Sequence, residues 1–221
     1  MDGSNETTRR PDAAGTRMIS RRTVMAGGGL LALAAVPARA TGDDAAAVAV
    51  IRSFYGTLLA TMKQGQQLGF NGRRDKLAPA IRQAYDFPLM TRLTVGPTWP
   101  QLAHDQQTQI TDAFTAFSIA TYANRFDGYS GERFVVNDTP QHLANGNVIV
   151  KSQLVNTDGT NVELDYLMTQ DAGKWQIVDV YLSGTVSELA VRRSEFSSVM
   201  RRGGPAALVA LLQRKTAELS S

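Results

Sequence analysis

The stretch KWQIVDVYLSG, Lys174–Gly184, decides the fold because it is a strand candidate with apolar residues on both faces. Strict alternation divides its side chains into two sets, with Trp175, Ile177, Asp179 and Tyr181 on one face and Val178, Val180 and Leu182 on the other. A strand that is apolar on both faces must be covered on both sides. We therefore expect core helices on one side and either further helix or a cavity on the other.

Three more strand candidates precede this stretch, at residues 132–136, 147–155 and 161–169. The turn sequences Asn145-Gly146 and Asp158-Gly159 lie before the second and third of them, and Asp171-Ala172-Gly173 lies before the fourth. Consecutive strands joined by short turns form an antiparallel meander. The sequence thus predicts a sheet of about four strands within residues 129–183.

Helical periodicity surrounds the sheet on both sides in the sequence. Apolar residues at three- and four-residue spacings predict helices at 45–63, 73–85, 88–94 and 105–126, with a glycine-punctuated loop at 64–72. Further helices are expected at 186–200 and 205–217, where Pro205 favours a first turn. Helices first, a sheet next and helices last indicate an α+β architecture in one domain, 41–217.

The first forty residues have the order of an export signal. Ser20–Met25 contains paired arginines, an apolar run follows from Ala26 to Val36, and Ala38-Arg39-Ala40 supplies small residues for cleavage. Paired arginines are typical of the twin-arginine (Tat) route, so we predict a Tat signal at 1–40. The alternative is an uncleaved membrane anchor, but the apolar run is shorter than the roughly 20 residues of a spanning helix.

Charge and reactive side chains exclude several function classes. Residues 1–40 carry six arginines and three acids, which leaves 17 residues of each sign in the rest of the chain. A nucleic-acid binder needs a surplus of cations, so nucleic acid is not an expected partner. The chain has no cysteine, and its two histidines, His104 and His142, are not spaced as metal ligands on one helix. We predict no catalytic residue, no cofactor and no metal site.

Asp179 leaves two alternatives open, because a buried carboxylate requires partners. In the structural interpretation it accepts hydrogen bonds from backbone or from an arginine, Arg192 or Arg193, and fixes the sheet to the helix after Ser187. In the catalytic interpretation it is a general base in a pocket, on a scaffold like that of ketosteroid isomerase.

Four groups of motifs follow one another along the chain: Thr121–Phe126 with Tyr129–Glu132, Lys174–Val180, Ser187–Ala190 and Arg192–Phe196. Together they resemble the MlaC/toluene-tolerance family, and the resemblance extends from about Ala45 to Leu212. A closer similarity is to the hopanoid-associated HpnM branch, on Met62–Gly65, Leu68–Phe70 and Phe87–Leu93.

This resemblance implies an NTF2-like fold, a curved sheet closed by helices with a small helical subdomain, and a periplasmic lipid carrier. The alternatives are an NTF2-like isomerase or dehydratase that acts on a hydrophobic substrate, and a transporter accessory subunit that binds no lipid. The implied cargo is a phospholipid or hopanoid whose chains occupy an apolar cavity. The implied partners are an inner-membrane lipid transporter and outer-membrane acceptor proteins, with transient membrane contact. Apolar face and position select the candidate cavity residues: Tyr122, Phe126, Phe134, Val150, Leu154, Leu164, Tyr166, Met168, Ile177, Tyr181, Leu189 and Phe196.

Overall fold

A computed structural model describes residues 39–220 of the 221-residue chain. The predicted export signal, 1–40, lies outside the described residues apart from Arg39 and Ala40, which open the first helix. The described residues, 39–220, belong to one compact unit. Its elements are α1 (Arg39–Met62), α2 (Gly65–Ala84), α3 (Phe87–Val95), η1 (Gly96–Gln101), α4 (His104–Arg125), β1 (Arg133–Val136), β2 (Gln141–His142), β3 (Val148–Val150), β4 (Ser152–Val155), β5 (Asn161–Asp171), β6 (Lys174–Leu182), β7 (Val186–Ser187) and α5 (Glu188–Glu218).

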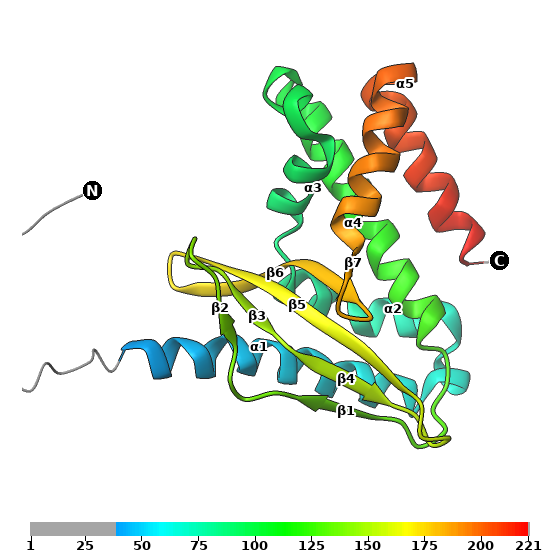
Figure 1. Cartoon of the computed structure of the whole chain (residues 1–221). Helices are drawn as coiled ribbons and strands as arrows, with labels where there is room; N and C mark the ends of the chain where they lie inside the picture. The colour runs from blue at the N-terminus through cyan, green and yellow to red at the C-terminus, as the bar shows by residue number, and fades with distance from the viewer. Residues whose placement is uncertain (1–38, 221) are drawn as a thin grey trace, which may run out of the picture. The chain divides into compact units, whose positions relative to one another are not determined.

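The strands form one antiparallel sheet, which confirms the predicted α+β class. β5 is its long central strand: β6 pairs with one edge, and β3 and β4 pair with the other, extended by β2 and β1. The predicted second strand, 147–155, is interrupted at Lys151, which separates β3 from β4. Figure 1 shows α1 running along one face of this open sheet, and α1 contacts β1, β3 and β6.

The pairing of β5 with β6 contains a β-bulge that the sequence analysis missed. Tyr166 pairs with Val180, but Met168 pairs with Ile177, so β6 carries one extra residue at Val178. An extra residue reverses the alternation of side chains beyond it. The prediction that Ile177 and Tyr181 share a face was therefore wrong.

Glycines in the helical parts mark one further correction, at 64–72, and one boundary that was predicted, before Pro205. The loop expected at 64–72 is helical from Gly65, with a kink at Gly69, whose φ is 59° and ψ −178°. An ideal Cβ on Gly65 would lie 2.1 Å from the carbonyl oxygen of Asp127, so only glycine allows this close approach. The two predicted C-terminal helices are the halves of α5, which kinks at Gly204 (φ 67°).

The helices supply most of the core. α4 packs against α2, α3 and α5, while α3 and α5 also contact β6. In Figure 1, α3, the first half of α4 and the α5 kink project away from the sheet, and these helices correspond to the predicted helical subdomain. Gly42–Met62 of α1 has the length and mean hydropathy (1.4) of a membrane span. Its apolar residues Ile51 and Leu58 are fully buried in the core, which accounts for that composition.

Candidate functional site

A hollow lies between the sheet and the helices, enclosed by α3, α4, the start of α5 and strands β5 and β6. Its volume is about 130 Å³. The aromatic part of its wall consists of Tyr85, Phe87, Phe114, Phe117, Tyr122, Phe126 and Tyr166. The aliphatic part consists of Met90, Leu164, Val180, Leu182 and Leu189.

The aromatic wall is held by ring packing across several elements. Phe87 of α3 meets Phe114 of α4 edge-on, with ring centroids 5.9 Å apart and an interplanar angle of 87°. Tyr122 stacks on Phe126 one turn away, at 5.7 Å and 13°. Such pairs stabilise a wall beyond the area that they bury. This part of the wall is thus formed by aromatic rings packed against one another.

The tyrosine hydroxyls in this wall are kept neutral and paired. The hydroxyls of Tyr85 and Tyr122 hydrogen-bond to each other. Burial raises the pKa of Tyr85 and of Tyr166 well above the ordinary value, and it also raises the pKa of Tyr122. Removing an ionisable group from water disfavours its charged form, so these side chains place no charge in the wall at neutral pH.

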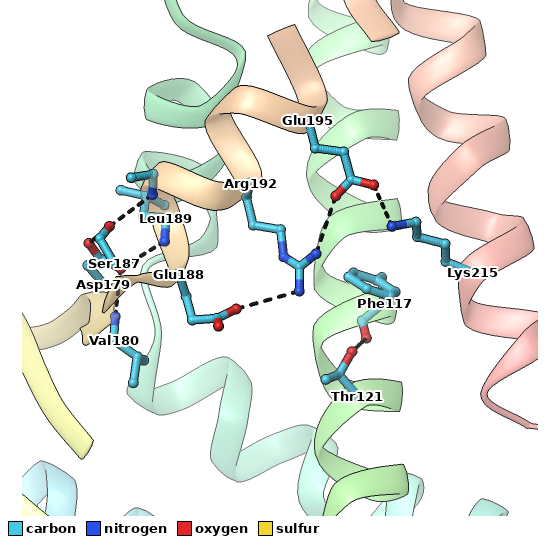
Figure 2. Close-up of polar contacts among 11 residues, drawn as sticks. Phe117, Thr121, Asp179, Val180, Ser187, Glu188, Leu189, Arg192, Glu195 and Lys215 are labelled. Carbon is cyan, nitrogen blue, oxygen red and sulfur yellow. Dashed lines mark hydrogen bonds and ion pairs between the residues drawn. The ribbon is translucent and has the colours of Figure 1, made fainter. Parts of the chain in front are cut away.

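Asp179 reaches the start of α5 (Figure 2). One of its oxygens accepts hydrogen bonds from the backbone nitrogens of Val180 (2.7 Å) and Leu189 (2.9 Å), and the other accepts one from the Ser187 hydroxyl (2.5 Å). Ser187 is itself the N-cap of α5 and accepts from the nitrogen of Ala190. A carboxylate at a helix N-terminus satisfies free N–H groups and interacts favourably with the helix dipole. This geometry has the features of the structural interpretation, with backbone and serine as donors.

The two arginines have other contacts. Arg192 lies 3.6 Å from Glu188 and 3.3 Å from Glu195, and its guanidinium lies 5.1 Å from the centroid of the Phe117 ring. Glu195 also pairs with Lys215 from the second half of α5, as Figure 2 shows. Arg193 is exposed and lies beside Gly96. Within residues 42–220, neither arginine pairs with Asp179.

The structure brings five of the twelve predicted cavity residues to the hollow. They are Tyr122, Phe126, Leu164, Tyr166 and Leu189. Five others lie on the same face of the sheet, where they belong to its core beside the hollow: Phe134, Val150, Leu154, Met168 and Ile177.

The remaining two lie elsewhere for separate reasons. Tyr181 pairs with Asp165 and so faces the opposite side of the sheet, because of the bulge in β6. Phe196 is fully buried behind the hollow, edge-on to Phe114 at 5.2 Å.

Sequence reasoning missed lining residues from three places. Tyr85, Phe87 and Met90 come from the end of α2 and from α3, where a short apolar helix carries no sign of facing a cavity. Phe114 and Phe117 belong to the apolar stripe of α4, for which core packing is the default interpretation. Val180 and Leu182 were assigned to the wrong face of β6, a consequence of the same bulge.

Comparison with known proteins supports one family. The family model described as MlaC protein matches residues 52–214. A solved phospholipid-binding protein from Ralstonia solanacearum, in complex with a phospholipid, aligns with a TM-score of 0.69 and 26% identity, covering 79% of this chain and 99% of that chain. A search of curated proteins gives no significant match. The family model covers well over half of the sequence, and the chain therefore belongs to the MlaC protein family.

Proposed function

We propose that this protein is a periplasmic lipid carrier that holds hydrocarbon chains in the hollow between its sheet and its helices. The observation that carries the proposal is the hollow itself, walled by twelve apolar or aromatic side chains, in a member of the MlaC family. The phospholipid bound to the Ralstonia solanacearum relative supports the same class of cargo. A hopanoid is the second candidate cargo, from the resemblance of Phe87–Leu93 to the HpnM branch.

Transfer free energy explains why such a wall is needed. Each buried methylene contributes about 0.8 kcal/mol, so two acyl chains represent on the order of 20 kcal/mol that a carrier must largely replace. A dry, aromatic and aliphatic wall with paired hydroxyls meets this requirement, whereas an unpaired polar atom would weaken binding. The enclosed space holds roughly ten water-sized spheres, enough for a segment of one hydrocarbon chain. The remainder of the cargo would occupy the wider space toward the opening.

The proposed route is between the inner and outer membranes. The family is periplasmic, and the predicted Tat signal at 1–40 is consistent with export. In this proposal the protein accepts or delivers lipid at an inner-membrane transporter and at outer-membrane proteins, with brief contact at each membrane. It performs no chemistry on the lipid.

The test is extraction of the purified full chain with organic solvent, followed by mass spectrometry. We expect co-purified phospholipid or hopanoid at up to one molecule per chain. A second measurement follows transfer of fluorescent phospholipid from vesicles to delipidated protein. A protein that carries no lipid and takes none from vesicles would refute the proposal.

A further inference from the structure

The polar groups of the lining differ in how completely their contacts are satisfied. Apart from the tyrosines and Asp179, five lining residues have polar or charged side chains: Ser118, Thr121, Arg125, Glu188 and Arg192. The Thr121 hydroxyl donates to the carbonyl of Phe117. Arg192 donates to Glu195 and is packed on the Phe117 ring. These two side chains are therefore already engaged within the protein.

The two carboxylates of the lining differ most in the hydrogen bonds that they accept. Asp179 accepts three hydrogen bonds and has little remaining capacity. Glu188 accepts no hydrogen bond from the described residues, and its contact with Arg192, at 3.6 Å, is an ion pair beyond hydrogen-bond distance. Its side chain is 28% exposed, so it is accessible to a ligand that lies in the hollow.

The two guanidinium groups of the lining differ in their ion pairs. Arg192 is held by its acidic partners, but Arg125, at the last residue of α4, is exposed and makes no ion pair with any described residue. Arg125 and Glu188 lie on different helices, and both line the hollow together with Tyr122. The lining thus offers one cation without an ion pair among the described residues, Arg125, and one anion, Glu188, whose ion pair with Arg192 uses a single carboxylate oxygen at 3.6 Å.

We infer that the hollow selects a zwitterionic phospholipid, whose phosphate lies at Arg125 and whose cationic primary amine lies at Glu188. A guanidinium presents paired donors that match phosphate oxygens. A primary ammonium has three N–H donors for a carboxylate that still has free lone pairs. A phospholipid that lacks the amine would place its phosphate near the Glu188 carboxylate without adding a cation to the one that Arg192 supplies there. The inference rests on the proposed carrier function and names the head-group class for the same site.

The experiment is a competition between two head groups. Delipidated full chain is incubated with vesicles of phosphatidylethanolamine and phosphatidylglycerol in equal amounts, with identical acyl chains, and the bound lipids are measured by mass spectrometry. We expect an excess of bound phosphatidylethanolamine of about threefold, the size of a partly exposed ion pair. Glu188→Gln should bring the ratio close to one, and Glu188→Asp should keep most of the excess.

Two further variants separate selectivity from general binding. Arg125→Gln should reduce the bound amount of both lipids without changing their ratio, because both carry the phosphate. Asp112→Asn removes the same charge from an exposed residue of α4 outside the lining and should change neither quantity. The excess in the unmodified protein should also fall as the salt concentration rises, since salt screens exposed charges.

The possible outcomes are distinct. Bound lipid with a ratio of one in the unmodified protein, or with an excess that Glu188→Gln leaves unchanged, overturns this inference and leaves the carrier function standing. No bound lipid of either class overturns both.

Discussion

Replacing Asp179 by alanine tests whether its carboxylate holds β6 to α5. The residue is 3% exposed and accepts hydrogen bonds from Val180, Ser187 and Leu189. Alanine would leave two partly buried N–H groups without their acceptor, and a hydrogen bond to a charged group contributes about 1.5–3 kcal/mol. Because solvent can reach part of this region, we expect the free energy of unfolding to fall by about 2–4 kcal/mol. For a domain of this size, the melting temperature should fall by roughly 5–15 °C.

The assay is urea and thermal unfolding followed by circular dichroism, with Asp179→Asn and Asp171→Ala beside the alanine variant. Asparagine keeps one oxygen for the backbone donors, so its loss should be intermediate, about 1–2 kcal/mol. Asp171 is exposed at the end of β5, and its loss should change stability by less than about 0.5 kcal/mol. The structural reasoning would be refuted by an Asp179→Asn protein as stable as the original. If that stable variant also lost turnover of a hydrophobic substrate, the interpretation of Asp179 as a general base would replace the structural interpretation.

Three other predictions follow from the geometry. Gly65→Ala should destabilise the protein by more than about 2 kcal/mol, because the added Cβ would lie 2.1 Å from the Asp127 carbonyl oxygen. Urea unfolding measures this loss, and an unchanged unfolding midpoint would contradict the close approach of Gly65 to Asp127. Burial keeps Tyr85 neutral in the folded protein while the unfolded chain ionises near pH 10, so stability should hold up to about pH 9 and fall as the pH rises above about 10. Tyr85→Phe should reduce this loss of stability at alkaline pH. If stability depended on pH in the same way in the variant and in the original protein, Tyr85 would not be the group responsible. Ser118→Phe should fill the hollow and reduce bound lipid several-fold without lowering the melting temperature, whereas Ser194→Phe, at an exposed position of α5, should bind lipid normally.

The sequence predicted those parts of the fold that depend on local periodicity and turns. The meander follows from Asn145-Gly146, Asp158-Gly159 and the alternation in β5, whose face comprising Leu164 and Tyr166 is as expected. The bulge at Val178 could not be predicted, because an apolar residue inside an apolar strand gives no local sign of a lost pairing partner. One such residue was sufficient to reverse the expected positions of Val180 and Tyr181.

The candidate site was less predictable than the fold for a different physical reason. A cavity is space that side chains fail to fill, and the same aromatic residues can line a hollow or pack a core. Phe117 lines the hollow and Phe196 is buried behind it, although both are phenylalanines on apolar helix faces. Only the relative positions of α3, α4 and α5 distinguish them, and those positions depend on contacts between residues far apart in the sequence.

The carboxylate in the middle of KWQIVDVYLSG now has a physical explanation that links fold to site. Asp179 directly follows the extra residue of the bulge, and its hydrogen bonds fix the first turn of α5, which carries Leu189, Glu188 and Arg192 into the lining. The wall of the hollow on this side is therefore positioned from the sheet by this side chain together with the pairing of β7 with β6. Because the wall depends on these bonds, a change at Asp179 should increase the rate of lipid loss under conditions where the protein remains folded. Equal rates of lipid release from Asp179→Asn and from the unmodified protein, measured well below the melting temperature of both, would mean that the wall is positioned by packing alone.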